Sequence, residues 1–325
     1  MSDPRTALPP WACDVLASPG KLLPVKQEGD RLIASDGVAV GSIVDGVACF
    51  PTKTDDSSIA FYREVGGAHF FERASVAYSM SALDTTVYHS YLAELRCDDL
   101  DAVILDVGGG DGRNATPWLN WGFKRVVVID PARAALARLR ARLAASHPEW
   151  LDRVLLIEAD ARQLPLRPDC AERIQAIEAL AYLNDDYALG LTECRRVMST
   201  GARLLVADRD YEAGLLTRLF YGGGIAGMLQ QAGTRGILDG NDQRSVTSRC
   251  FTGEEFAAIV HRHGLRILSH RGISLLSLVL GHERGGGRLL LDDEAHLPEV
   301  HAVLRTLAET GKMRRSHVII AERET

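Results

Sequence analysis

The segment Val103–Gly112 constrains the fold more than any other part of the chain, because it joins a buried strand to a glycine-rich turn. Val103–Val107 is the apolar run expected of a strand buried on both faces of a parallel sheet, with Asp106 near its carboxyl end. Alternate glycines follow, which let the backbone turn sharply: Gly108, Gly110 and Gly112. A helix is predicted over residues 113–121. A strand, a glycine turn and a helix N-terminus in this order predict a place where a nucleotide-like ligand approaches backbone amides.

Two further acids stand at the ends of predicted strands. The run at 125–129 ends at Asp130, and the run at 154–157 is followed closely by Asp160. A carboxylate at the end of a second strand can accept both hydroxyls of a ribose, which is why dinucleotide folds place an acid about 20 residues after the glycine turn. The simpler alternative is that Asp130 only caps a helix that begins at Pro131. Acids at three successive strand ends favour a ligand site.

Residues 100–210 resemble the cofactor half of a class I S-adenosylmethionine-dependent methyltransferase. Asp106–Gly112 is similar to the first motif of that family, an acid followed by alternating glycines. The resemblance implies that Asp130 binds the ribose, that Asp160 meets the adenine amino group and that the amide of Ala161 meets the adenine ring. The implied cofactor residues are Asp106, Gly108, Gly110, Gly112, Asp130, Pro131, Asp160, Ala161 and Glu178. The implied fold is a doubly wound, mostly parallel α/β sheet of seven strands, whose last strand, at 317–323, is antiparallel.

A nicotinamide-dependent dehydrogenase is the closest competing class of enzyme. The segment Gly110–Ala115 satisfies the G-x-G-x-x-A fingerprint, with Asp130 20 positions beyond Gly110. That frame begins after the strand has ended, and it brings Asp111 into a phosphate loop, where its charge would repel a pyrophosphate. It also leaves Asp160 without a role. The pattern therefore favours the methyltransferase.

Composition and charge exclude several other classes. With 46% hydrophobic and 25% charged residues the chain can bury a full core. Its net charge of -6 argues against a broad nucleic-acid surface. No signal peptide and no apolar run of the roughly 18 residues needed for a membrane span are found. The six cysteines are scattered and no His-x-x-x-His pair occurs, so we expect reduced thiols, a cytoplasmic protein and no metal.

Residues 1–55 are predicted to form a small β-rich module, with short runs joined by Gly and Asp turns. Its segments 16–19 and 43–47 resemble the zinc-ribbon-like module that accompanies many methyltransferases. In metal-bearing members, cysteines occupy the places held here by Ser18 and its neighbours. We therefore expect a module without zinc that depends on docking for its stability, since so short a segment is marginal alone.

Residues 56–99 are predicted to be a helical segment that precedes the methyltransferase core at 100–325, and the core carries an insertion at about 211–250. Relatives of this fold use such a segment to cover the cofactor. An insertion that leaves the carboxyl end of a strand is well placed to act as a lid. Rings suited to line a substrate cavity come from both parts: Tyr62, Tyr78, Tyr88 and Tyr211.

The predicted function is S-adenosylmethionine-dependent methyl transfer to a small organic molecule, with an oxygen, nitrogen or carbon acceptor left open. A base is required only if the acceptor must lose a proton. The candidate catalytic residues are His69, His89, Tyr182 and Asp210. The alternative is a methyltransferase-like scaffold that serves as a partner subunit without activity, although such a scaffold has no need of the three acids. Assembly as a homodimer is left open.

Overall fold

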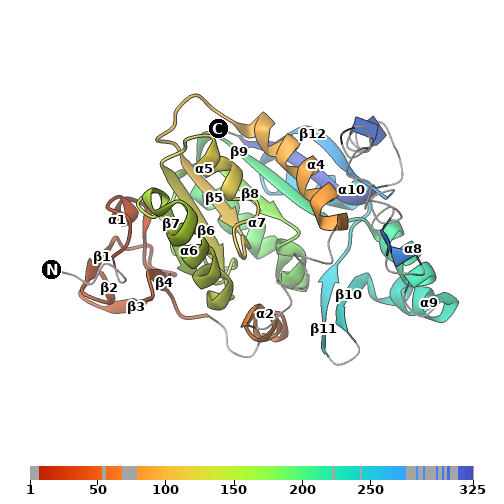
Figure 1. Cartoon of the computed structure of the whole chain (residues 1–325), viewed down its shortest axis with the longest axis horizontal. Helices are drawn as coiled ribbons and strands as arrows, with labels where there is room; N and C mark the ends of the chain where they lie inside the picture. Colours follow the sequence, from red (N-terminus) through yellow and green to blue (C-terminus); the bar gives the residue numbers. More distant parts are fainter. Residues whose placement is uncertain are drawn as a thin grey trace.

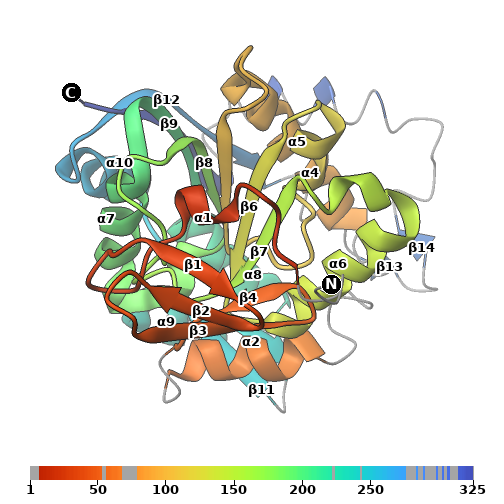
Figure 2. The same ribbon diagram turned by 90° about the vertical axis from the view of Figure 1, so that its left-hand side faces the viewer.

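The molecule is built on one large mixed sheet, seen in the computed structural model from two sides in Figures 1 and 2. The structure describes residues 7–52, 56–67, 79–221, 224–241, 244–275 and 314–324, with a few short pieces between 283 and 307. The strand order is β1-β2-β3-β4-β7-β6-β5-β8-β9-β15-β12. The predicted α/β class is confirmed.

The centre of the sheet is parallel and deeply buried. Its five parallel strands are β5 (Val103–Val107), β6 (Arg125–Asp130), β7 (Val154–Glu158), β8 (Ala171–Ile177) and β9 (Met198–Arg209). Every residue of β5 and β7 is buried, as their continuous apolar runs predict. Since parallel strands end at the same edge, the acids at the ends of β5, β6 and β7 meet there.

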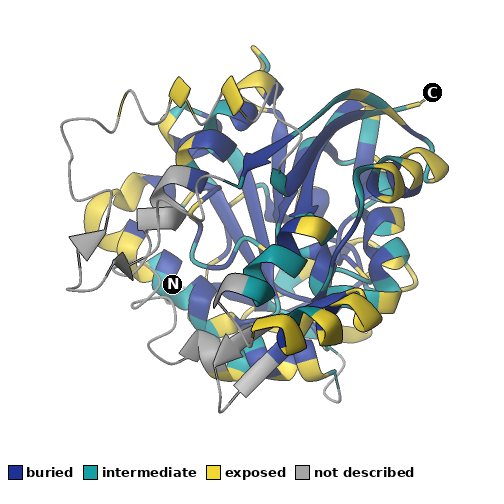
Figure 3. Ribbon diagram, turned by 90° about the vertical axis from the view of Figure 1, so that its right-hand side faces the viewer, coloured by how far each residue is buried: buried dark blue, intermediate teal, exposed yellow. Residues whose placement is uncertain are grey.

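Helices cover both faces of this sheet, each through its own apolar cluster. One face carries α4 (Ser79–Leu95), α5 (Thr116–Asn120) and α6 (Arg133–Ser146). The other carries α1 (Ala12–Val15), α7 (Tyr187–Val197) and α10 (Gly253–Arg262). Figure 3 shows the sheet buried between helices whose outer turns are exposed. The arrangement is the doubly wound one that alternating strands and helices produce.

Two antiparallel pairings complete the far end of the sheet. Strand β15 (Arg314–Arg323) lies between β9 and β12 (Leu265–Ser274) and runs antiparallel to both. The antiparallel last strand predicted at 317–323 is thus confirmed.

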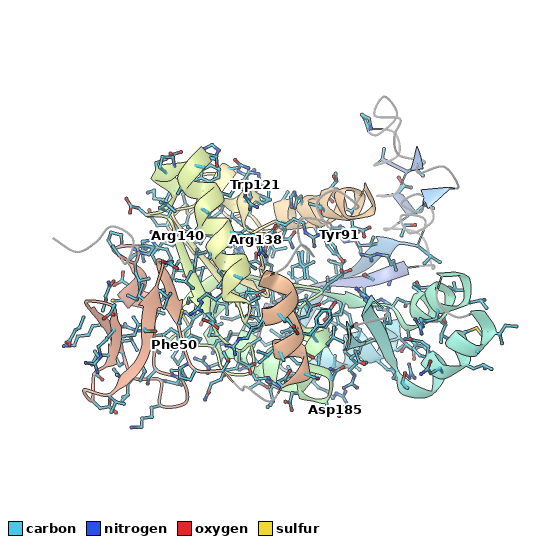
Figure 4. All side chains as sticks on the ribbon, turned by 60° about the horizontal axis from the view of Figure 1, so that its bottom comes forward. Phe50, Tyr91, Trp121, Arg138, Arg140 and Asp185 are labelled. Carbon is cyan, nitrogen blue, oxygen red and sulfur yellow. The ribbon has the colours of Figure 1, made fainter. Side chains whose placement is uncertain are left out.

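The predicted number of seven strands is wrong, because the sheet has eleven. The additional strands come from the N-terminal segment: β1 (Val25–Glu28), β2 (Arg31–Ala34), β3 (Ala39–Val44) and β4 (Val47–Cys49). β4 pairs in parallel with β7, so the free edge of β7 is covered. Phe50 is 4% exposed and lies where these strands meet the rest of the protein, as Figure 4 shows. A short segment that cannot bury its own core gains stability by extending an existing sheet.

The remaining elements include a helix near the carboxyl ends of the parallel strands, a 3-10 helix between α6 and β7, another that follows β8, and the elements that follow β9. They are α2 (Ser57–Gly67), the 3-10 helices at Pro148–Trp150 and Leu180–Asp186 (η2), α8 (Tyr211–Tyr221), α9 (Gly224–Thr234), β10 (Gly236–Asn241), β11 (Arg244–Arg249), β13 (Glu283–Arg284) and β14 (Arg288–Leu289). α8 and α9 stand beside the hairpin β10–β11 at one end of the molecule (Figure 1). Among the described residues, no helix has the length and apolar character of a membrane span.

Candidate functional site

The turn after β5 depends on glycine at each of the three predicted positions. Gly108, Gly110 and Gly112 have φ angles of 72°, 53° and 81°, in the left-handed region that side chains disfavour. A Cβ atom on Gly108 would lie 2.3 Å from the Cβ of Ala179, and one on Gly112 would lie 2.6 Å from Leu139. The turn therefore packs tightly between the end of β8 and α6, and it holds its backbone at the carboxyl edge of the sheet.

Asp106 lies under this turn and keeps one unsatisfied oxygen. Its side chain is buried, with 1% exposure, and Oδ2 accepts no hydrogen bond from the described residues. Burial, assisted by the charge of Asp130, raises the pKa of Asp106 to about 7. A buried carboxylate oxygen without a donor is uncommon, and a cationic or hydrogen-bonding ligand would satisfy it.

Asp130 connects the end of β6 to the glycine turn. Its Oδ2 accepts a hydrogen bond from the Gly110 amide at 2.9 Å, and its Oδ1 accepts one from the Ala132 amide at 2.7 Å. Burial raises the pKa of Asp130 to about 6, although both hydrogen bonds oppose this rise. Asp130 is not the cap of a helix that begins at Pro131, because α6 begins at Arg133 with Ala132 as its N-cap residue and has no side-chain cap hydrogen bond. The carboxylate instead holds the Ala132 amide just before the helix. Each oxygen still has a second lone pair for a ligand hydroxyl.

Asp160, after β7, is held by a neighbouring arginine that the sequence analysis missed. Arg162 Nη2 lies 2.6 Å from Asp160 Oδ2, and Arg162 Nε donates to both carboxylate oxygens. The same guanidinium donates to Asp56 at 2.6 Å and to Asp186 at 3.1 Å, and its side chain is 7% exposed. Arg162 thus ties the start of α2 and the end of η2 to the loop that contains Ala161.

Arg63 brings α2 over the ends of β6 and β7. Its Nε donates to the carbonyl of Pro131 at 3.2 Å, and its Nη2 donates to Glu158 Oε1 at 2.8 Å. A cavity of about 460 Å³ opens beside Arg63, Arg133 and Glu158. α2 is therefore positioned above the edge where Asp130 and Asp160 lie.

Glu178 follows β8 and belongs to a largely buried ion-pair cluster. Its Oε1 accepts hydrogen bonds from Arg315 at 2.8 Å, Ser316 at 3.0 Å and Tyr88 at 3.1 Å. Arg315 also lies 2.5 Å from Asp84. Burial alone would raise the pKa of Glu178, but Arg315 and nearby arginines lower it to about 2. Its φ of 50° is unfavourable for a side-chain-bearing residue, as is common at functional sites.

Asp210 lies at the start of the segment 211–250, which the sequence predicts to be an insertion. Its Oδ1 accepts from the Ala213 amide at 2.8 Å, and its Oδ2 lies 2.8 Å from Nε2 of buried His317. The same His317 nitrogen lies 3.2 Å from the Phe251 carbonyl, at the other end of the insertion. No local sequence pattern indicates His317, which is more than 100 residues from Asp210. The pair holds both ends of the insertion together.

The remaining described residues predicted to bind the substrate or to act in catalysis do not form one cluster in the structure. Tyr62 and Tyr182 pack edge to face with ring centroids 4.9 Å apart, which brings α2 against η2. Tyr211 donates to the Ala232 carbonyl at 3.2 Å. His89 Nε2 lies 3.2 Å from the Arg113 carbonyl, and burial lowers the pKa of His89. His69 and Tyr78 lie outside the described residues.

A family model and two curated relatives indicate a methyltransferase. Residues 104–201 match the family model of a methyltransferase domain. The chain is 27% identical over 174 residues to the ubiquinone/menaquinone biosynthesis C-methyltransferase of Acidiphilium cryptum, covering 53% of this chain and 69% of that protein. It is 24% identical over 184 residues to the chloroplastic 2-methyl-6-phytyl-1,4-hydroquinone methyltransferase of Arabidopsis thaliana, covering 52% of each chain.

A solved structure supports the fold. The 1,6-didemethyltoxoflavin-N1-methyltransferase of Burkholderia thailandensis, with bound 1,6-didemethyltoxoflavin and S-adenosylhomocysteine, superimposes with a TM-score of 0.50. It is 17% identical and covers 95% of this chain and 100% of its own. The matched domain model spans β5 to the start of β9, and therefore includes the glycine turn and the three acids.

Proposed function

Because this chain is an S-adenosylmethionine-dependent methyltransferase, we propose that it methylates a small organic molecule bound at the carboxyl ends of β8 and β9. Ligands of open α/β sheets bind outside these strand ends. One observation carries the proposal: Asp130 accepts a hydrogen bond from the Gly110 amide at 2.9 Å, and the orphaned Oδ2 of Asp106 lies next to the neighbouring Gly109, where an added Cβ would be 2.7 Å from it. The part of the sheet edge predicted to bind the cofactor is therefore held in place by hydrogen bonds within the protein.

The residues present suit the cofactor. The unsatisfied Oδ2 of buried Asp106 would receive the ammonium group of the methionine part, directly or through water. Asp130 would accept the ribose hydroxyls, and Asp160 with Ala161 would face the adenine. When bound, S-adenosylmethionine supplies an electrophilic methyl group on its sulfonium. The chain's own part is to orient an acceptor and to exclude water.

An aromatic acceptor is the substrate class we favour. One curated relative is named a C-methyltransferase of ubiquinone/menaquinone biosynthesis, and the other is named a hydroquinone methyltransferase. The Tyr62–Tyr182 pair on α2 and η2 provides aromatic surface near the predicted adenine residues, since Arg162 joins the same two segments. The acceptor would lie beneath a cover made by α2, α4 and the 211–250 insertion.

The ion-pair cluster and the histidines limit which residue can act as a base. Glu178, with a pKa of about 2, is a poor proton acceptor at neutral pH. Burial lowers the pKa of His89, and its Nε2 donates to the Arg113 carbonyl, which leaves Nδ1 as the acceptor. We assign the base to His89 for an acceptor that must lose a proton.

His89→Asn should lower kcat about a hundredfold at unchanged cofactor affinity; an unchanged kcat would reject the assignment.

Product formation tests the function directly. The purified chain is incubated with S-adenosylmethionine and a panel of phenols, hydroquinones and heterocyclic amines, and S-adenosylhomocysteine is quantified by mass spectrometry. We expect acceptor-dependent product from at least one aromatic compound. Methylation of bulk tRNA or protein with none of the small molecules would contradict the proposal.

The insertion should be needed for transfer and dispensable for cofactor binding. Replacing residues 221–236 with a short linker removes α9 and keeps the base of the insertion, where His317 contacts Asp210 and Phe251. Methyl transfer should fall about a hundredfold or more because the acceptor is no longer oriented and shielded. Cofactor affinity, measured by calorimetry, should survive because the acids lie on β5–β7. Full transfer by the deletion variant would show that this segment is no lid.

The N-terminal strands are proposed to be a zinc-ribbon-like module that has lost its metal. Ser18 Oγ accepts from the Leu23 amide at 3.0 Å, and the Ser18 amide donates to the Leu23 carbonyl at 2.8 Å. These hydrogen bonds close the turn that a bound thiolate would otherwise order. Elemental analysis of purified chain should find far less than one zinc per molecule. Stoichiometric zinc that resists chelation would overturn this assignment.

We further propose that the protein is located in the cytoplasm. All six cysteines are free thiols, as expected in a reducing compartment. Fractionation of the native host cells, with the chain detected by antibody, would test it.

A further inference from the structure

A positively charged hollow lies near the amino ends of β8 and β9, whereas the glycine turn lies at the carboxyl edge of the sheet. Its volume is about 580 Å³, and its walls come from the last turns of α7 and α10, the loop before β8 and the end of β15. The charged and titratable groups that line it are Arg195, Arg196, Arg262, His263, Arg323 and Asp169. Four arginines gather here although the chain as a whole carries a net charge of -6.

Two of these arginines are already neutralised within the protein. Arg196 pairs with Glu193 at 2.7 Å and also donates to the Leu166 carbonyl at 2.7 Å. Arg323 donates to Asp169 through Nη1. The internal pairs therefore account for two positive charges and for the acid in the wall.

The positive charges of Arg195 and Arg262 are not paired with an acid of the described residues. Neither has a hydrogen bond or an ion pair with another described residue. The guanidinium of Arg195 passes close over Gly264, where an added Cβ would lie 3.0 Å from its Nε. Because Gly264, with a φ of 67°, has no side chain, it leaves room for this guanidinium. His263 uses Nδ1 on the Ile259 carbonyl at 2.7 Å, which leaves Nε2 for another partner.

We propose that this hollow binds the phosphate group of a small phosphate monoester. A phosphate monoester carries a charge between about -1.5 and -2 at pH 7, which balances the two free guanidiniums. Arginine forks donate two parallel hydrogen bonds to phosphate oxygens, and Arg195 and Arg262 approach from different helices. The hollow is open to solvent and, at about 580 Å³, admits more than a phosphate alone.

Helix C-termini favour basic residues even without a ligand, because the last carbonyls carry partial negative charge. That role would make Arg195 and Arg262 matter for stability alone. Ligand binding separates the two roles, since a helix-terminus role predicts no saturable binding of phosphate compounds. The hollow also lies away from Asp106 and Asp130, so a failure of the phosphate proposal would leave the methyl-transfer proposal untouched.

Calorimetry with ribose 5-phosphate and with uncharged ribose tests the assignment on the full chain. We expect saturable binding of ribose 5-phosphate and none of ribose. The double variant Arg195→Gln/Arg262→Gln should bind ribose 5-phosphate at least about tenfold more weakly, the loss expected when charged hydrogen bonds are removed. The matched control Arg266→Gln, which changes an arginine paired with Glu322 outside the hollow, should bind like the original chain.

Retained affinity for S-adenosylhomocysteine shows that the double variant is folded. Each of the following results would overturn the proposal: no saturable binding of ribose 5-phosphate, equal binding by the double variant, or equal loss in the Arg266→Gln control. Inorganic phosphate provides the last comparison. If it binds as tightly as the ester, the rest of the hollow contributes nothing and the monoester assignment is wrong.

Discussion

Asp130→Ala is expected to weaken S-adenosylmethionine binding by about tenfold to 150-fold, measured by calorimetry. The physical reason is the loss of hydrogen bonds to a charged acceptor, worth about 1.5–3 kcal/mol. The variant should also be less stable, because the amides of Gly110 and Ala132 lose their acceptor. Both effects arise from one carboxylate that orders the turn and faces the ligand.

Two comparisons make this result specific. Asp101→Ala removes an exposed acid paired with Lys124, and it should leave cofactor affinity unchanged. Asp130→Asn keeps one oxygen acceptor, so it should fall between the original chain and alanine. Unaltered affinity in Asp130→Ala would reject the ribose assignment, and tighter binding of NAD than of S-adenosylmethionine would favour a dehydrogenase.

Arg315→Met is expected to reduce the free energy of unfolding by about 3–5 kcal/mol, the typical cost of removing one partner from a buried ion pair. Asp84 and Glu178 would both lose the guanidinium that compensates them, and their side chains are 4% and 18% exposed. Urea denaturation at pH 7 measures the change. Arg266→Met breaks an exposed pair with Glu322 and should have a far smaller effect.

The cost of Arg315→Met should depend on pH in a defined direction. The folded pKa of Glu178 is lowered to about 2 from an ordinary value of 4.5, so its contribution is complete above pH 4.5 and disappears as the pH falls toward 2. The stability difference between the original chain and the variant should therefore be larger at pH 7 than at pH 4. A difference that grows as the pH falls would contradict this account of the cluster.

The parallel core could be predicted because its signals are local. Continuous apolar runs at β5, β6 and β7, each followed closely by an acid, describe strands buried on both faces whatever the rest of the chain does. The glycine turn was equally clear, since left-handed φ angles leave few alternatives to glycine at 108, 110 and 112. Resemblance to a family then added the ligand.

The size of the sheet and the polar clusters depend on contacts between distant residues, which leave no local pattern. Nothing in the residues of β4 indicates that its partner is β7, more than 100 positions later. The same holds for Glu178 with Arg315 and for Asp210 with His317. Arg162 is different, because it stands two residues from Asp160 and could have been suspected as its partner.

A crystal structure of the chain with S-adenosylhomocysteine tests the central claim most directly. We expect the ribose hydroxyls within hydrogen-bond distance of the Asp130 carboxylate, the amino-acid part above Gly108–Gly112, and the adenine beside Asp160 and Ala161. Density for the cofactor in any other place, or a ribose that makes no contact with Asp130 in a fully occupied site, would contradict it.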